Sequence, residues 1–393
     1  MTTTTTVPRV DSKGVNPLKA LLEYGQSPWM DYIRRDLLTS GTLKKMIQED
    51  GLMGMTSNPT IFEKAIIGSK DYADILESPE AKKLDAKGVY EKIAIRDVQD
   101  AADIFKGVYQ QSKRRDGYVS LEVAPTLAND TQGTVEEARR LWKSVGRENV
   151  MIKVPGTKEG LPAIRQLLEE GININITLLF AQSVYEQVAE AFLAALEARV
   201  KKGQDISHIA SVASFFVSRI DTLVESKIDA LLKDATLPAD RKALLQSLMG
   251  KVAIANAKLA YQSYKQIFAG PRWQALATRG GQTQRVLWAS TSTKNPAYRD
   301  VLYVEELIGP DTVDTIPPAT LDAFRDHGRV RASLEEDVEG ARHTMNDLAR
   351  AGISMKQVTD QLTDDGVKLF VQAFDELLDT VGKTVKQQAG ASA

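Results

Sequence analysis

The sequence lacks cysteine, has few histidines and contains no long hydrophobic run, and each absence narrows the possible functions. Without cysteine, the 393-residue chain can form neither disulfides, thiolate nucleophiles nor cysteine–zinc sites. The three histidines, His208, His327 and His343, are too scattered in sequence to predict a metal cluster or a Ser–His–Asp triad. No stretch of about 18 apolar residues occurs, and the N-terminal residues lack the apolar core of a signal peptide. We therefore expect a soluble cytoplasmic protein without a metal.

Strong net charge and a nucleotide fingerprint are also missing. The formal net charge is −2, with basic and acidic residues interspersed, so neither nucleic acid nor a membrane surface is expected as a partner. No glycine-rich loop follows the first expected strand, and Gly280-Gly281 precede a strand, so a dinucleotide cofactor is not predicted. We expect no cofactor at all. Apolar residues make up 43% of the chain, enough for a sizeable core.

Among the features that are present, the stretch Val150 to Val154 stands out. Four of its five residues are apolar and three are β-branched, which predicts a short strand buried on both faces. Lys153 interrupts it. A lysine in such a strand either extends its ammonium to water or is buried and shifted toward its neutral form. The strand alone favours the first interpretation, and the rest of the chain must decide.

Short apolar strands alternate with helical segments along the whole chain. Eight strands are expected, near residues 30, 54, 121, 152, 175, 211, 288 and 314. This alternation predicts a parallel sheet with helical crossovers, and eight units suit a single (β/α)₈ TIM barrel with extra helices. A doubly wound open sheet is the alternative. We expect a flexible tail over residues 1–15, one barrel domain with helical insertions and C-terminal helices over 16–386, and a loose tail over 387–393.

The surplus length lies at residues 70–95, at 222–280 and after 319. Residues 70–95 are charged and irregular before an amphipathic helix at 96–114, residues 222–270 are expected to be helical, and 319–388 are helical too. Residues 70–95 and 319–388 could cover a pocket, pack under the barrel or mediate assembly. Sequence gives no oligomeric state, and a homo-oligomer is possible.

Polar residues occur at the C-terminal ends of the expected strands, which face one pocket in a barrel. They are Asp31, Thr56, Asn58, Glu122, Lys153, Asn175, Thr177, Ser214 and Ser290, with Arg219 just beyond the sixth strand. Each alone has a simpler explanation as a helix cap, a turn or a surface ion pair. Together they bring two carboxylates to a lysine with neutral hydrogen-bonding groups. A buried lysine can lose its proton and form a Schiff base with a carbonyl, and a carboxylate such as Asp31 can accept a hydroxyl proton. The residues thus predict a cofactor-free enzyme of the lysine-imine type.

Several segments also resemble the signature motifs of the transaldolase family. They keep their order over about residues 16–385 and comprise Thr56-Ser-Asn-Pro-Thr-Ile-Phe62, Val119-Ser-Leu-Glu-Val123, Ile152-Lys-Val-Pro-Gly-Thr157, Ile174-Asn-Ile-Thr-Leu-Leu-Phe180 and Ser214-Phe-Phe-Val-Ser-Arg219. The chain length and Leu287-Trp-Ala-Ser-Thr-Ser-Thr-Lys-Asn-Pro296 are similar to the longer, bacterial-type branch.

The resemblance implies a role for each matching residue. Lys153 falls at the imine-forming lysine and Asp31 at the acid/base carboxylate, while Glu122 and Thr177 match residues that hold a catalytic water. The residues matching groups that bind the dihydroxyacetone portion are Thr56, Asn58, Asn175 and Ser214. Those matching the phosphate clamp are Arg219 and Ser290.

One position departs from the better-known branch of the family. A second arginine there follows the clamp serine by two residues, whereas this chain has Ser292, and Lys294 could supply the charge from the same loop. An ammonium gives a point contact in place of a guanidinium fork, so phosphate affinity or substrate range is expected to differ.

The resemblance implies transfer of a dihydroxyacetone unit from sedoheptulose 7-phosphate or fructose 6-phosphate to an aldose phosphate such as glyceraldehyde 3-phosphate, a step of the non-oxidative pentose phosphate pathway. Two alternatives remain open. A fructose 6-phosphate aldolase-like lyase would release dihydroxyacetone to water, although Glu122 and the chain length favour transfer. A sugar-phosphate-binding barrel without activity is disfavoured by the presence of both Lys153 and Asp31.

Overall fold

The computed structural model describes residues 16–66 and 69–391. The tail expected at residues 1–15 lies outside the described residues. Eight parallel strands close into a barrel in chain order, which confirms the predicted (β/α)₈ fold and excludes the open sheet. The strands are β1 Gln26–Asp31, β2 Gly54–Thr56, β3 Val119–Glu122, β4 Val150–Pro155, β5 Ile174–Leu179, β6 Ser211–Phe216, β7 Arg285–Ala289 and β8 Thr312–Ile316.

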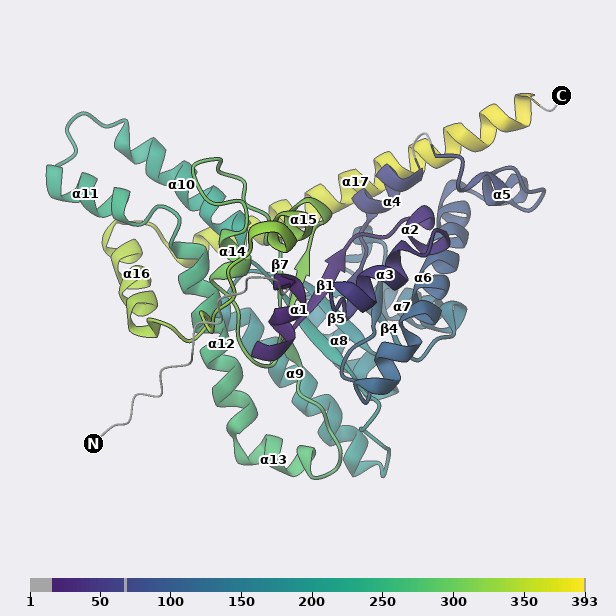
Figure 1. Ribbon diagram of the computed structural model, residues 1–393, viewed down its shortest axis with the longest axis horizontal. Coiled ribbons are helices and arrows are strands. Elements are labelled where there is room, and N and C mark those ends of the chain that lie inside the picture. The colour runs from purple at the N-terminus through teal and green to yellow at the C-terminus, as the bar shows by residue number, and fades with distance from the viewer. Residues whose placement is uncertain (1–15, 67–68, 392–393) are drawn as a thin grey trace.

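Helices surround the barrel, and α10, α11 and α16 project from one side of it as a wing (Figure 1). Those between β1 and β6 are α2 Arg35–Thr39, α3 Thr42–Glu49, α4 Pro59–Ile66, α5 Ala73–Leu76, η2 Ala81–Lys83, α6 Ala86–Gln111, η3 Pro125–Leu127, α7 Thr131–Val145, α8 Gly160–Glu170 and α9 Gln182–Lys201. Before β1 and after β6 come α1 Pro17–Ala20, η1 Leu21–Tyr24, α10 Ser218–Leu232, α11 Ala239–Ser247, α12 Val252–Ala269, α13 Pro271–Ala277, α14 Leu302–Glu305, α15 Pro318–His327, α16 Val338–Arg350 and α17 Met355–Ala391.

Three expected helices have different bounds in the structure. The helix predicted at 96–114 begins ten residues earlier, at Ala86, because the Asp85 carboxylate caps it by accepting from Gly88 N at 2.8 Å. The segment 222–270 is divided among α10, α11 and α12, with breaks at Pro238 and at Gly250, whose φ is +70°. The last helix, α17, continues to Ala391, past the predicted boundary at 386.

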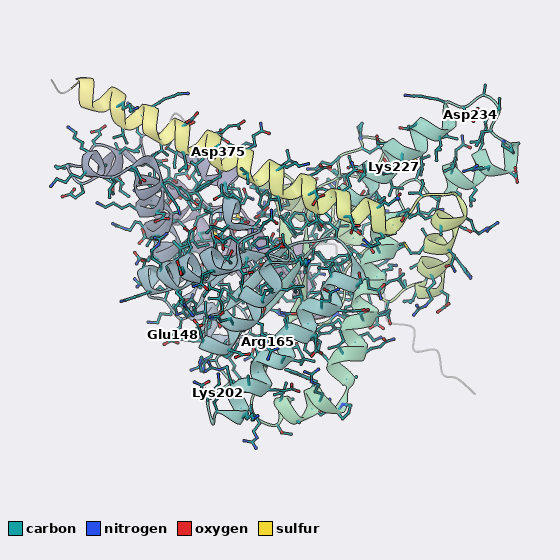
Figure 2. All side chains as sticks on the ribbon, turned by 180° about the vertical axis from the view of Figure 1, so that it is seen from behind. Glu148, Arg165, Lys202, Lys227, Asp234 and Asp375 are labelled. Atoms are coloured by element: carbon teal, nitrogen blue, oxygen red, sulfur yellow. The ribbon has the colours of Figure 1, made fainter. Side chains whose placement is uncertain are left out.

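The helix α17 crosses the whole molecule. It runs along the upper edge in Figure 1, and the opposite view in Figure 2 shows the same helix (yellow) reaching from the α16 side of the wing to the α4–α5 side. Its Phe370 side chain is buried and lines a cavity at the C-terminal ends of the strands. The C-terminal segment therefore covers the pocket, one of the roles left open by the sequence. None of the helices in the described ranges is long and apolar enough to cross a membrane.

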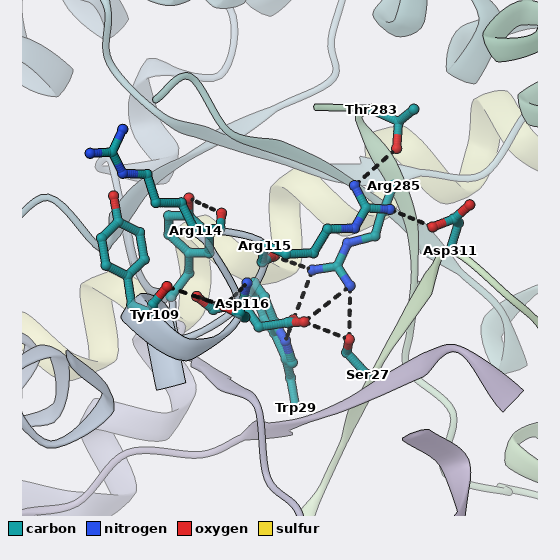
Figure 3. A network of polar contacts seen from close by, with 11 residues as sticks. Ser27, Trp29, Tyr109, Arg114, Arg115, Asp116, Thr283, Arg285 and Asp311 are labelled. Carbon is teal, nitrogen blue, oxygen red and sulfur yellow. Dashed lines mark hydrogen bonds and ion pairs between the residues drawn. The ribbon is translucent and has the colours of Figure 1, made fainter. Parts of the chain in front are cut away.

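A buried ion pair fastens the opposite, N-terminal end of the barrel (Figure 3). Arg285 on β7 contacts Asp116, just before β3, at 2.8 Å. The Asp116 carboxylate also accepts hydrogen bonds from Ser27 Oγ and Trp29 Nε1 of β1, both at 2.9 Å. The network joins strands that are distant in sequence and lies away from the strand ends where barrel enzymes carry their chemistry.

Candidate active site

Lys153 lies at the same level of the barrel as two other predicted site residues, Glu122 and Asn175, on the strands to either side. In the sheet register, Lys153 on β4 is paired with Glu122 on β3 and with Asn175 on β5. Parallel pairing fixes this arrangement, because side chains at paired positions point to the same face. The same rule sets Asp31 on β1 beside Thr56 on β2.

The Lys153 side chain is buried inside the barrel, with 5% of the residue exposed. Its Nζ donates a hydrogen bond to Ser57 O at 3.0 Å and lies 3.4 Å from Glu122 Oε2. An ammonium that extends to water would not be enclosed in this way. The interpretation favoured by the strand alone, an ammonium that extends to water, is therefore wrong, and the burial that the surrounding chain favoured is observed.

Glu122 and Thr177 present two unsatisfied polar atoms. Glu122 Oε2 and Thr177 Oγ1 are buried and make no hydrogen bond to any residue that the structure describes. Burial raises the pKa of Glu122, and the nearby charge of Lys153 opposes that rise. A buried polar atom without a hydrogen bond is costly, so Thr177 Oγ1 calls for a water or a substrate group, whereas Glu122 Oε2 already faces Lys153 Nζ in an ion pair.

Hydrogen bonds orient the remaining polar side chains on the barrel wall. Thr56 Oγ1 donates to Asp31 Oδ1 at 2.7 Å. Ser214 Oγ donates to Asn175 Oδ1 at 2.6 Å, while Asn175 Nδ2 donates to the Oγ of Ser120 at 3.1 Å. The Asn175 amide is thus held in one orientation.

Asn58 performs the structural role expected of a turn residue as well as lining the cavity. Its side-chain oxygen accepts from Ile61 N at 3.0 Å at the start of α4. The cap fixes the side chain in the wall of the pocket.

Two cations lie at one end of the pocket. Arg219 on α10 stacks over the Phe216 ring at 5.4 Å, and Lys294 Nζ donates to Ser292 Oγ at 2.7 Å. Neither cation forms an ion pair with a carboxylate of the described chain, and burial lowers the pKa of both. The charge of Arg219 lowers the pKa of Lys294 further. Two unpaired cations that repel each other favour a dianion between them.

Ser290 lies beside these cations at the end of β7. It has a φ of +57°, unusual for a residue with a side chain, and its Oγ is 3.0 Å from Ser218 Oγ at the start of α10. The strained conformation turns the serine into the cavity.

These groups border one cavity of about 550 Å³ at the C-terminal ends of the strands. Of the predicted site residues, those lining it are Asp31, Thr56, Asn58, Lys153, Thr177, Ser214, Arg219, Ser290 and Lys294. Glu122 and Asn175 lie behind this wall, in contact with Lys153 and Ser214. A larger hollow of about 1040 Å³, near Asn149 at the start of β4, lies at the opposite end of the barrel and holds none of the predicted residues.

Several lining residues were not anticipated from the sequence. They are Tyr32, Thr60, Ile61, Lys64, Phe216, Ala289, Thr315, Pro317, Pro318, Ala319 and Phe370. Thr315 could have been found, since it occupies the end of the eighth strand. Lys64 and Phe370 belong to helices α4 and α17, whose sequence patterns do not indicate which side faces the pocket. No group of three or more metal-ligating side chains suited to an ion occurs within the described residues.

The fold and the position of the cavity are those of a (β/α)₈ barrel enzyme, whose chemistry takes place at the C-terminal ends of the strands. The chain belongs to the transaldolase/fructose-6-phosphate aldolase family, whose model matches residues 28–381. It is 49% identical to a transaldolase of Trichodesmium erythraeum over 95% of this chain and 98% of that protein. It is 48% identical to transaldolase 2 of Nostoc sp. (95% and 98% covered) and 45% identical to a transaldolase of Thiobacillus denitrificans (94% and 100%).

A solved structure described as a putative fructose-1,6-biphosphate aldolase from Coccidioides immitis covers 96% of this chain and 99% of its own. It shares 9% sequence identity and a TM-score of 0.25, too little to bear on fold or function.

Proposed function

We propose that Lys153 carries the transaldolase activity of this chain through a Schiff base. The activity itself follows from the family and from relatives that match almost end to end. The observation that carries the proposal is the burial of Lys153 beside Glu122, in register with Asn175. In this proposal Glu122 Oε2, which lies 3.4 Å from Lys153 Nζ, takes the ammonium proton and leaves a neutral amine that can attack a carbonyl.

The reaction proceeds in two halves in this proposal. Lys153 Nζ attacks the C2 carbonyl of sedoheptulose 7-phosphate or fructose 6-phosphate, and loss of water gives a protonated imine. Asp31 removes the C4-hydroxyl proton, the C3–C4 bond breaks into the imine, and the shortened aldose phosphate leaves. The remaining three-carbon enamine attacks the aldehyde of glyceraldehyde 3-phosphate, Asp31 returns the proton, and hydrolysis of the imine frees the ketose phosphate.

The other predicted residues bind and orient substrate and water. Thr177 Oγ1, which makes no hydrogen bond to a described residue, and the Glu122 carboxyl beside Lys153 bind the water that imine formation expels and hydrolysis consumes. Thr56, Asn58, Asn175 and Ser214 bind the hydroxyls of the dihydroxyacetone portion. Arg219, Ser290 and Lys294 hold the phosphate, a role supported by the two unpaired cations at that end of the cavity. A location in the cytoplasm and a possible homo-oligomer stay part of the proposal.

Borohydride reduction in the presence of fructose 6-phosphate tests the nucleophile. A three-carbon adduct on Lys153, found by peptide mass spectrometry, is the expected result. Lys153→Ala should form no adduct and show no turnover while keeping the wild-type circular dichroism. Lys158→Ala, at an exposed lysine just after the same strand, should react normally. An adduct on another lysine, or turnover by Lys153→Ala, would exclude the assignment.

The rival lyase reaction is separated by an acceptor experiment. A transaldolase releases little dihydroxyacetone from fructose 6-phosphate unless water reaches the enamine. The rate of dihydroxyacetone release without an acceptor is compared with the rate of sugar-phosphate formation with an acceptor. Equal rates would favour the lyase.

A further inference from the structure

The loop that follows β7 contributes three residues to the cavity wall and has little regular structure. Ser290, Ser292 and Lys294 all lie in it, and the next helix, α14, begins only at Leu302. A lysine has four flexible side-chain bonds, and the charge of Arg219 acts on Lys294 in the same cavity. Like charges repel, so the loop needs an anchor if the ammonium is to stay opposite the guanidinium.

Glu225 provides such an anchor from α10, the helix that also carries Arg219. It is 8% exposed and accepts hydrogen bonds from two side chains of the loop. Asn295 Nδ2 donates to Glu225 Oε2 at 3.1 Å, and Tyr298 OH donates to Glu225 Oε1 at 2.6 Å. Asn295 directly follows Lys294 in sequence. One helix therefore carries one cation and fixes the loop that carries the other.

The anchor also includes the start of α12. Gly250 N donates to Glu225 Oε1 at 3.1 Å. The Tyr298 ring packs directly on Gly250. A Cβ at this position would lie 2.9 Å from Cζ of the ring, so any residue other than glycine would displace the ring. The loop is thus held by packing as well as by hydrogen bonds.

The partners of Glu225 are neutral donors. Within the described chain it forms no ion pair with a lysine or arginine, so its charge is stabilised without neutralising Arg219 or Lys294. An acidic residue that paired with either cation would compete with a phosphate. Glu225 can fix the loop and still leave both cations free.

We propose that Glu225 is a positioning residue that holds Lys294 opposite Arg219 through Asn295 and Tyr298, and so sets the preference for phosphorylated over unphosphorylated sugars. The inference rests on the proposed function, in which these cations bind the substrate phosphate. Glu225 itself touches no substrate.

Two variants each weaken the anchor. Tyr298→Phe deletes one hydroxyl and keeps the ring over Gly250, and Glu225→Gln removes the charge while keeping the shape. Each should raise KM for glyceraldehyde 3-phosphate about tenfold, the effect of roughly 1.4 kcal/mol, and leave kcat and the KM for unphosphorylated glyceraldehyde within about twofold. If Glu225→Gln does not fold, Tyr298→Phe still decides the matter.

The matched control is Tyr303→Phe. Tyr303 OH donates to Asp221 Oδ2 at 2.9 Å, so this change also removes a hydroxyl bound to a buried carboxylate of α10, but one outside the loop. It should lower thermal stability without changing the preference for phosphate.

Binding of inorganic phosphate, followed by its effect on the unfolding temperature, provides a readout that needs no activity. Phosphate should stabilise the wild type and Tyr303→Phe more than Tyr298→Phe. The role of Glu225 would be overturned if the variants raised KM equally for glyceraldehyde 3-phosphate and for glyceraldehyde. It would also be overturned if neither KM nor the stabilisation by phosphate changed. Absence of turnover in the wild type with normal phosphate binding would instead count against the proposed function.

Discussion

Glu122 and Asp314 are buried carboxyl groups of the same barrel, and their surroundings give them different properties. Burial raises the pKa of both, but Glu122 has the ammonium of Lys153 beside it. Asp314 on β8 has only the hydroxyl of Thr291, which donates to Oδ1 at 3.0 Å, and its Oδ2 has no partner in the described chain. Burial raises the pKa of Asp314 to about 8. Asp314 is therefore protonated at neutral pH. Its hydrogen-bond partner Thr291 directly follows Ser290 in sequence.

Replacing this acid tests that conclusion. An ordinary aspartate has a pKa near 4, so between about pH 4 and 8 the folded protein holds a proton that the unfolded chain has lost. The free energy of unfolding should fall as the pH rises through this window and stay low above it. Asp314→Asn does not titrate and can still accept from Thr291, so it should gain stability relative to the wild type with rising pH. A gain of at least about 1 kcal/mol between pH 5 and pH 8.5, measured by urea unfolding, is expected; a pH-independent difference would contradict the argument.

Asp31→Asn separates imine formation from carbon–carbon cleavage. The amide keeps the oxygen that accepts from Thr56 but cannot take the C4-hydroxyl proton. The rate of cleavage should fall about 10²–10⁴-fold, the usual contribution of a positioned acid or base. Borohydride should then trap the intact six-carbon sugar on Lys153 in place of the three-carbon unit. A three-carbon adduct formed at the normal rate would assign the proton transfer to another group.

Prediction from sequence succeeded at the residue scale where strand geometry alone places a side chain. Residues at the ends of parallel strands share one face, so Lys153, Thr177 and Ser214 could be assigned to one pocket. Glu225 could not be singled out, because its partners Asn295 and Tyr298 are about 70 residues away. Contacts of that kind depend on how a loop packs on a helix, which no local pattern determines.

At the scale of elements, strands were predicted more reliably than helix ends. Buried parallel strands are continuous apolar runs, and all eight were found near their expected positions. Helix ends depend on capping and packing. The start of α6 at Ala86 follows from the Asp85 cap, and the apolar face of its first turns is formed by the buried residues Val89, Tyr90 and Ile93, which the irregular 70–95 segment did not make evident. The contact of α17 with the pocket depends on the path of the chain after β8 and could not be derived.

The helix α17 should protect the covalent intermediate from water. Phe370 is 9% exposed and lines the cavity, whereas its neighbour Leu369 is 52% exposed. Phe370→Leu removes part of the cover and should cost about 1–2 kcal/mol of stability. Because water then reaches the enamine more easily, more dihydroxyacetone should be released per transfer to glyceraldehyde 3-phosphate.

The adjacent variant Leu369→Ala is the control for this experiment. It changes the same helix on its exposed side and should leave both stability and the ratio of release to transfer unchanged. An unchanged ratio in Phe370→Leu would show that α17 contributes packing without excluding water.

On the scale of the whole molecule, the two ends of the barrel have separate tasks. The candidate site lies at the C-terminal ends of the strands, and the Arg285–Asp116 network lies at the other end. Four hydrogen-bonded groups from β1, β7 and the segment before β3 meet there (Figure 3). They are separated by up to 258 residues in sequence, so only the closed barrel brings them together.

Removal of one partner from that network should destabilise the barrel without altering its chemistry. Asp116→Ala leaves the Arg285 guanidinium buried without its countercharge, and a loss of about 3–5 kcal/mol is expected in urea unfolding. Arg115→Ala breaks the neighbouring but exposed pair with Asp311 and should cost about 0–1 kcal/mol. Because the network does not touch the cavity, kcat and KM of the folded fraction should stay at wild-type values in both variants. A fall in kcat of folded Asp116→Ala would mean that the two ends of the barrel are coupled, since strain at the N-terminal ends would then reach Lys153 along the strands.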